Sequence, residues 1–152
     1  MDTATVRYSA MGRLVTNAGG EVPVSCALTY DPTDPWAVTL VLWPHSSDPV
    51  VWQFARELLA DGRREIANPG GSVTVSPAPD VPPGVWGPWI RIDLANPCDG
   101  RHAVVLIPLH AVIAFLIRTY QQVSAGDEAR RIDWDPVLRA WLDRGFDEGW
   151  AA

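Results

Sequence analysis

The chain contains no lysine, because all twelve of its basic residues are arginine, against eighteen acidic residues. The formal net charge at pH 7 is therefore −6. The arginines are scattered, and the only adjacent pairs are Arg63-Arg64 and Arg130-Arg131. A protein that follows the phosphates of a nucleic acid normally presents a basic face. The composition therefore disfavours nucleic-acid binding.

Cysteine and long apolar runs are also scarce. Cys26 and Cys98 are far apart and neither belongs to a CxxC motif, so we expect two buried, reduced thiols. The longest apolar run, Ala103–Leu109, is far shorter than the roughly 20 residues that cross a bilayer. Residues 1–13 lack the basic and apolar regions of a secretory signal. We therefore expect a soluble, cytoplasmic protein without membrane insertion.

The composition is that of an ordinary globular protein, with an excess of tryptophan. The chain has 152 residues, of which 47% are hydrophobic and 20% charged. This length predicts one domain, residues 1–144, followed by a short tail, residues 145–152. Eight tryptophans are many for this length, and they indicate heavy burial or a contact surface.

The stretch Leu28–Gly62 carries the clearest local pattern. Two Asp-Pro pairs precede an apolar strand at Trp36–Trp43, and a turn at Pro44–Pro49 leads to a second strand at Val50–Phe54. Both faces of the first strand are apolar, which predicts that it is covered on both sides. A short helix over Ala55–Ala60, closed by Gly62, must dock on the sheet through Leu58 and Leu59, with Trp52 and Phe54 sharing one strand face.

Alternation and turn residues predict the remaining strands. Gly12 predicts a bulge, and Pro23, near the start of its strand, favours an edge or first position. Five prolines make Pro77–Pro88 a stiff surface loop. The predicted strands are Thr5–Thr16, Glu21–Tyr30, Ser72–Ser76, Trp89–Leu94 and Arg101–Ile107.

Two helices are predicted after the strands. The first begins near Pro108 and ends at Gly126, with Phe115 at the edge of its apolar face. The second has Asp135 as its cap and stops at Gly145. The fold class is α+β: a mostly antiparallel sheet of six to seven strands, a short mid-chain helix and two C-terminal helices. The apolar positions are Leu109, Val112, Ile113, Leu116, Ile117, Tyr120 and Val123 in the first helix, and Val137, Leu138, Trp141 and Leu142 in the second.

No motif for catalysis or for metal binding is present. His45, His102 and His110 occur without an HxxxH, HxH or HExxH spacing, and the chain has no GxSxG motif and no phosphate-binding loop. Asp31 and Asp34 are better explained by turn bonding than by acid–base catalysis. We therefore predict no catalytic residue, no cofactor and no metal.

Arg56 is the one charge whose position needs an explanation. It begins the short helix, where the helix dipole does not favour a cation. We hypothesise that it reaches a carboxylate, Asp31 or Asp34, and ties the helix to the preceding turn. Trp52, Phe54 and Arg56 would then hold the short helix to the sheet, and a partner would meet the protein beside that helix.

The blocks around Arg56 resemble the SsgA-like proteins, small sporulation and cell-division proteins of actinobacteria. The order and spacing of the similar segments cover roughly Val6 to Leu142. The strongest are Val22–Val24, Leu28–Asp31, Asp34–Val38 and Val51–Gly62; weaker ones are Val73–Pro77, Phe115–Thr119 and Ile132–Asp135.

The resemblance implies a non-enzymatic adaptor that helps to position septum formation. Family members associate with one another, and in the best-known case they help to recruit the tubulin-like division protein FtsZ. Their fold is similar to that of trimeric proteins that bind single-stranded nucleic acid, which implies a homotrimer here, at division septa. The candidate partner or structural residues are Tyr30, Asp31, Asp34, Trp36, Trp52, Phe54 and Arg56.

Two other classes of function stay open at this point. A single-stranded nucleic-acid binder would use the aromatic residues to stack bases, although the negative charge opposes it. A small-ligand or sugar-binding module would use exposed tryptophans. The segment Pro77–Pro88 and the tail after Arg144 depart from the family pattern, so the sequence does not assign one member's role.

Overall fold

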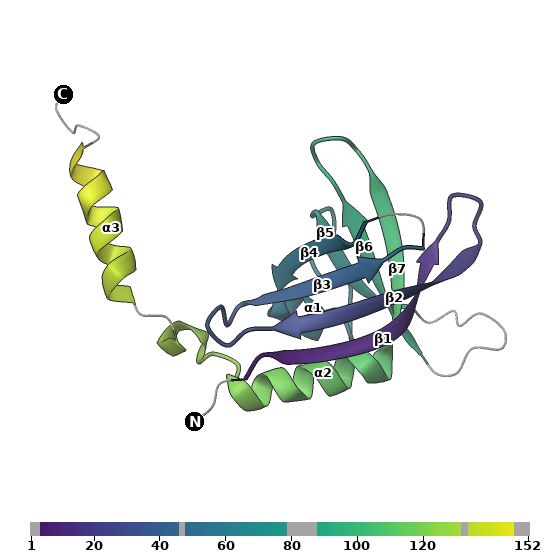
Figure 1. Cartoon of the computed structure of the whole chain (residues 1–152), viewed down its shortest axis with the longest axis horizontal. Helices are drawn as coiled ribbons and strands as arrows, with labels where there is room; N and C mark the ends of the chain where they lie inside the picture. Colours follow the sequence, from purple (N-terminus) through teal and green to yellow (C-terminus); the bar gives the residue numbers. More distant parts are fainter. Residues whose placement is uncertain (1–3, 46–47, 79–87, 132–133, 148–152) are drawn as a thin grey trace.

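The computed structural model describes residues 4–45, 48–78, 88–131 and 134–147, which form a seven-stranded antiparallel sheet with helices (Figure 1). The strand order is β4-β3-β2-β1-β7-β6-β5. The strands are β1 (Val6–Val15), β2 (Glu21–Tyr30), β3 (Ala37–Trp43), β4 (Val50–Ala55), β5 (Val73–Ala78), β6 (Trp89–Ala95) and β7 (His102–Pro108). The helices are α1 (Arg56–Asp61), α2 (Leu109–Gln122), the 3₁₀ helix η1 (Glu128–Arg131) and α3 (Trp134–Asp147).

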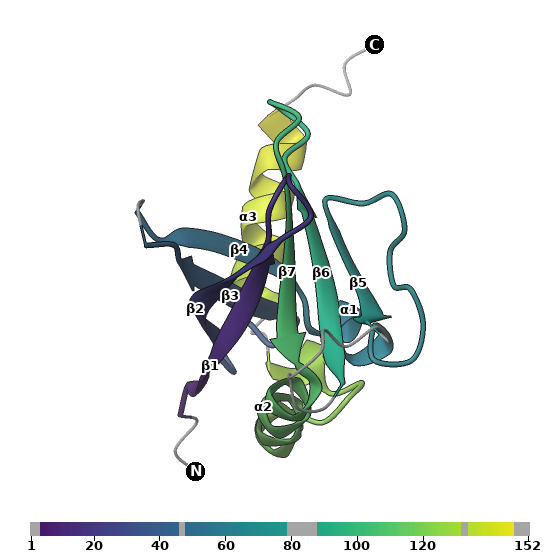
Figure 2. The same cartoon turned by 90° about the vertical axis from the view of Figure 1, so that its right-hand side faces the viewer.

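The sheet curls, so that strands from its two halves share one hydrophobic core. Val38 and Leu40 of β3 lie in the same buried cluster as Ile90 and Ile92 of β6, together with Phe115 of α2. Helix α2 runs along β1 (Figures 1 and 2). The α+β class, the antiparallel sheet and its number of strands are thus confirmed.

The stretch around Arg56 folds as its sequence predicts. Strands β3 and β4 pair in register from Ala37↔Ala55 to Leu42↔Val50, and α1 follows directly. Leu59 is fully buried and Leu58 packs against the core, which confirms the predicted docking of this short helix. The amide of Arg56 donates to the carbonyl of Trp36 at 2.7 Å and fixes the start of α1.

Gly12 does not form the predicted bulge. The register between β1 and β2 is continuous across Gly12↔Val24. A Cβ at residue 12 would lie 2.9 Å from the carbonyl oxygen of Leu106, so the glycine allows β7 to approach β1 closely. Pro23 lies in an interior strand, but outside the part of β2 that pairs with β3, so its missing N–H costs no bond there.

Helix α2 differs from its prediction in its bounds and in its buried face. Pro108 is the N-cap and not the first helical residue, and the helix ends at Gln122, before Gly126. Phe115 is fully buried, whereas Ile117 is 54% exposed. Val112, Leu116 and Val123 of the predicted stripe are buried, and the buried face also includes Ala111 and Thr119.

The prediction that β3 is covered on both faces is wrong for the single chain. Val38, Leu40 and Leu42 are buried, but on the opposite face Ala37, Thr39 and Val41 are only half-buried and Trp43 is exposed. The register places Met11 of β1, Trp43 of β3 and Val51 of β4 on this opposite face, where each is more than a third exposed. We call it the outer face; the half-buried Val41 and the buried Ala27 also belong to it.

The C-terminal part corrects two predictions. Helix α3 runs through Gly145, where an end was predicted, and reaches Asp147. Asp135 lies in its first turn and does not precede it. Leu138 and Leu142 of its apolar side are exposed, and α3 points away from the sheet (Figure 1).

Two smaller predictions are corrected, and one lies partly outside the described residues. Pro77 and Ala78 continue β5, so the predicted loop starts later, and its residues 79–87 are not described.

Cys26 is buried as predicted, and burial raises the pKa of its thiol to about 11. Cys98 is exposed in the turn between β6 and β7, so its predicted burial is wrong. No helix in the described parts of the chain is long and apolar enough to span a membrane.

Candidate functional site

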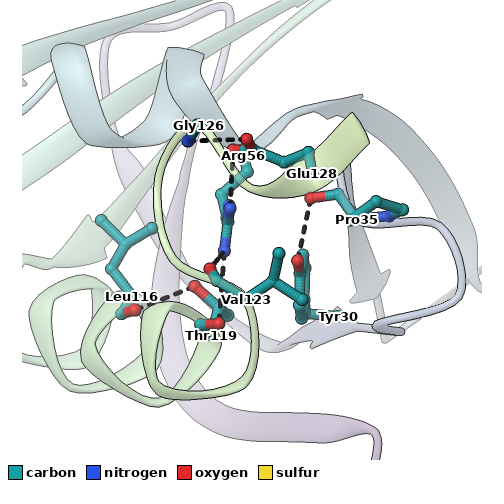
Figure 3. A network of polar contacts seen from close by, with 8 residues as sticks. All are labelled: Tyr30, Pro35, Arg56, Leu116, Thr119, Val123, Gly126 and Glu128. Atoms are coloured by element: carbon teal, nitrogen blue, oxygen red, sulfur yellow. Dashed lines mark hydrogen bonds and ion pairs between the residues drawn. The ribbon is translucent and has the colours of Figure 1, made fainter. Parts of the chain in front are cut away.

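Arg56 is the largest of the fully buried side chains, with 1% of its surface exposed. Its Nη1 donates to the carbonyl oxygens of Thr119, at 3.2 Å, and of Val123, at 2.8 Å (Figure 3). These carbonyls belong to the C-terminal end of α2, where a helix has too few amide donors for its last carbonyls and carries the negative end of its dipole. The carbonyl of Thr119 also accepts the amide of Val123. Arg56 lies at the N-terminal end of α1, where the helix dipole does not favour a cation, but its guanidinium caps the C-terminal end of α2.

Two tyrosines flank the guanidinium. The Cζ atom of Arg56 lies 4.9 Å from the ring centroid of Tyr30 and 4.2 Å from that of Tyr120, which are cation–π distances. The Tyr30 hydroxyl donates to the carbonyl of Pro35 at 2.9 Å and connects the site to the Asp-Pro turn. Burial raises the pKa of Tyr30 to about 12 and also raises the pKa of Tyr120, so both phenols are neutral at neutral pH.

Glu128 of η1 completes the site. Its Oε1 accepts a hydrogen bond from Arg56 Nη2 at 2.7 Å, and its Oε2 accepts the amide of Gly126 at 2.8 Å. Burial opposes ionisation of this carboxyl, but the hydrogen bond from Arg56 and the backbone donors outweigh it and lower its pKa. Arg56 and Glu128 therefore form an ion pair that joins α1 to the segment after α2.

The partner predicted for Arg56 is wrong. Asp31 Oδ1 instead accepts bonds from the backbone amide of Thr33, at 2.9 Å, and from its hydroxyl, at 2.8 Å. The bonds from Thr33 lower the pKa of the Asp31 carboxyl. The amide of Asp34 donates to the Asp31 carbonyl at 2.9 Å, so both residues build the turn, as their alternative interpretation predicted.

The structure brings three of the predicted residues together and leaves two elsewhere. Tyr30, Trp36 and Arg56 meet at one end of α2, where Trp36 is 41% exposed. Trp36 and Arg56 line a pocket of about 260 Å³ with Ala55, Glu57, Tyr120, Ala125, Gly126 and Glu128. Phe54 is buried in the sheet core, and Trp52 packs against that core.

Sequence reasoning missed half of this site: Thr119, Val123 and Glu128 were not connected with Arg56, and Tyr120 was taken as part of an apolar stripe. The contacts with Arg56 span from 63 to 72 residues of sequence, which no local pattern reports. One signal was available in Glu128, an acidic residue just after the helix-breaking Gly126.

The site is suited to holding segments together and not to proton transfer. An arginine stays protonated at neutral pH, and the two neutral tyrosines offer no base. In the described part of the chain, no three His, Cys, Asp or Glu side chains are grouped as a metal site would need. His45 and His110 are exposed, and the Nε2 atom of His102 in β7 lies 3.4 Å from Oδ1 of Asp93 in β6.

Comparisons with known proteins place these features in a family. The family model described as "Streptomyces sporulation and cell division protein, SsgA" matches residues 24–128, a range that contains both Arg56 and Glu128. The chain is 38% identical over 126 residues to the sporulation-specific cell division protein SsgB of Frankia casuarinae, covering 83% of each chain. It is also 38% identical over 142 residues to SsgB of Saccharopolyspora erythraea, covering 93% of this chain and 94% of that one.

Solved structures show the same fold. An SsgB structure from work on longitudinal cell division during sporulation of Streptomyces coelicolor aligns with a TM-score of 0.75 and 32% identity, covering 87% of this chain and 99% of that one. The SsgA-like sporulation-specific cell division protein of Thermobifida fusca aligns with a TM-score of 0.75 and 27% identity, covering 93% and 98%. The chain therefore belongs to the SsgA family of sporulation and cell-division proteins.

Proposed function

We propose that this protein is a non-enzymatic adaptor in sporulation-specific cell division, which positions or regulates septum formation through protein–protein contacts. The observation that carries the proposal is similarity over most of the chain to proteins named sporulation-specific cell division protein SsgB. The buried site around Arg56 agrees with an adaptor, because its groups are satisfied internally and serve to hold the fold.

The proposed partners are other SsgA-like proteins, the division protein FtsZ and further copies of this chain as a homotrimer. The outer face supports self-association, because Met11, Trp43 and Val51 expose apolar surface on one side of the sheet. Large apolar side chains that stay exposed on one face of a sheet often mark a contact with another protein. The proposed location is the division septum.

The proposal is tested in a sporulating actinobacterium that encodes the protein. A fluorescent fusion should collect at sporulation septa, and deletion of the gene should disturb their number or spacing. A tagged chain should retain division proteins from sporulating cells but not from vegetative cells, with the tag alone as control. Normal septa in the deletion strain, together with no septal fluorescence, would contradict the proposal.

A further inference from the structure

Strand β4 is an edge of the sheet without the usual protection of an edge. Its sequence, Val50–Ala55, contains no charged residue and no proline, and Val51 is 59% exposed. Natural proteins generally protect such edges with charge, proline or a covering segment, because the unpaired backbone groups invite another strand. A six-residue edge without charge or proline is therefore open to the addition of another strand.

The unpaired backbone groups of β4 can be identified. The amide of Arg56 donates to the carbonyl of Trp36, so the pair that follows the last pair of β3 and β4 is hydrogen-bonded. Hydrogen-bonded and non-hydrogen-bonded pairs alternate along two antiparallel strands, so Val50, Trp52 and Phe54 turn their N–H and C=O groups toward β3. Val51, Gln53 and Ala55 turn theirs outward. In the described part of the chain, no hydrogen bond is formed by the outward amides of these three residues or by the carbonyls of Val51 and Gln53, whereas the carbonyl of Ala55, the N-cap residue, accepts the first hydrogen bond of α1.

The other edge of the sheet is covered. Residue Ala67 pairs with Val75 of β5 through two backbone bonds, from the Ala67 amide at 2.8 Å and from the Val75 amide at 3.2 Å. Helix α1 also packs on β5, where Val75 is fully buried. Within the described residues, the fold thus closes one edge with its own chain and leaves β4 open.

A groove lies beside the open edge. Its volume is about 700 Å³, within the range of ligand-binding clefts. Val50 and Trp52 of β4 form one side, and Leu94 and Ala103 of β6 and β7 form the other. Its rim consists of Asn17, Asn96, Asp99, Gly100, Arg101 and His102, from two turns that lie at the same end of the sheet (Figure 2).

We infer that β4 and this groove bind an extended peptide segment of a partner protein as an added strand. The backbone of the peptide would pair with Val51, with Gln53 and with the amide of Ala55, and alternate side chains would point into the groove. The apolar walls favour a large aliphatic or aromatic side chain there. The backbone bonds supply affinity for any extended chain, and the groove selects the sequence.

An extended peptide fits this site better than a second copy of the chain. A second copy could not add its β5 edge, which is paired with Ala67, and could offer only its own β4 edge. The groove beside β4 instead offers an apolar site for the side chains of a single added strand. Pairing of two β4 edges is the alternative, and the test below separates it.

The test is a selection of random eight-residue peptides, displayed on phage, against the full-length protein. Enriched peptides should carry an apolar residue at one position, and its replacement by Asp should weaken binding at least about tenfold. An analogue N-methylated at the pairing amides keeps every side chain but cannot donate these bonds. It should also lose at least about tenfold in affinity.

Matched variants of the protein complete the test. Gln53→Pro removes an outward amide without touching the pairing with β3, and it should weaken peptide binding at least about tenfold. Gln53→Thr keeps the amide and should stay within about twofold of the wild type. Thermal unfolding of both variants controls for folding. Hydrogen exchange should show rapid exchange at Val51, Gln53 and Ala55 without peptide and slow exchange with it.

Three results would overturn the inference. They are the absence of enrichment over an unrelated protein, binding that survives both N-methylation and Gln53→Pro, and protection of the three outward amides before peptide is added. The last result would assign the edge to a second copy. The inference deepens the proposed adaptor function by naming a class of partner. Its test uses purified protein and peptides, so failure here would leave the septal localisation result untouched.

Discussion

At the scale of single residues, Arg56 shows how one side chain can join three parts of a chain. It begins α1, caps the end of α2 and pairs with Glu128 of η1. Lysine could not replace it, because its ammonium lacks the planar fork that reaches two carbonyls and a carboxylate while stacking on Tyr30 and Tyr120.

Arg56→Ala should destabilise the protein by about 3 kcal/mol or more, because it leaves a carboxylate and two helix carbonyls without their buried donor. Arg56→Lys should recover only part of this loss. Chemical denaturation at neutral pH measures both effects. Arg91→Ala is the matched control, since it breaks the exposed pair with Asp93 and should cost less than about 1 kcal/mol. Unchanged stability of Arg56→Ala with lost partner binding would assign Arg56 to a contact surface.

The ion pair also predicts a dependence of stability on pH. The pKa of Glu128 is lowered in the folded protein, so its contribution is present above its ordinary pKa of 4.5 and is lost as the pH falls through the folded value. The difference in unfolding free energy between the wild type and Glu128→Gln should therefore be largest at neutral pH and shrink in acid.

Denaturation series from pH 7 to pH 3 measure this difference. The control is the same substitution in an Arg56→Ala background, where the pH dependence of the difference should be weaker because the main donor to the carboxylate is missing. An equal pH dependence in both backgrounds would mean that Arg56 is not the source of the effect.

At the scale of elements, glycine decides how closely α1 approaches β5. Gly62 follows α1 with a right-handed helical φ of −63°, so its role does not depend on a left-handed backbone. A Cβ at this position would overlap Cγ1 of Val75 and lie 2.5 Å from its Cβ. Val75 is fully buried and stiff, so it has little room to move.

Gly62→Ala should therefore destabilise the protein by about 1–3 kcal/mol, although alanine is normally the better helix residue. Gly20→Ala is the matched control, because its Cβ would meet only the Thr16 hydroxyl at 3.4 Å. Thermal and chemical unfolding of the two variants provide the comparison. If Gly62→Ala proved as stable as the wild type, the close packing of α1 on β5 would be wrong.

The elements also show what sequence reasoning can reach. Strands such as β2 and the short helix α1 were predicted to within a residue, because alternation, turns and caps are local properties. The apolar face of α2 was predicted only in part: Val112 and Leu116 are buried as the pattern predicts, but Ile117 is exposed and Phe115 is fully buried, because burial depends on how the helix packs on the sheet. The true partner of Arg56 was missed for the same reason, because Glu128 comes close only through the fold.

At the scale of the whole molecule, the outer face is the largest disagreement between pattern and structure. The two-sided apolar pattern of β3 predicts cover on both faces, yet only the face with Leu40 is buried in one chain. The sequence pattern and the structure agree if other copies of the chain pack against the outer face. Apolar positions that are exposed in one chain and buried in an assembly are typical of oligomer interfaces.

Light scattering at micromolar concentration should therefore give three times the 16.6 kDa of one chain. Met11→Glu places a charge on the outer face, where Met11 is 56% exposed, and should shift the mass toward the monomer without unfolding the chain. Ile117→Glu is the matched control, because Ile117 is similarly exposed but lies on α2, away from the outer face. A wild-type mass of 16.6 kDa would rule out the trimer, and equal effects of both substitutions would place the interface elsewhere.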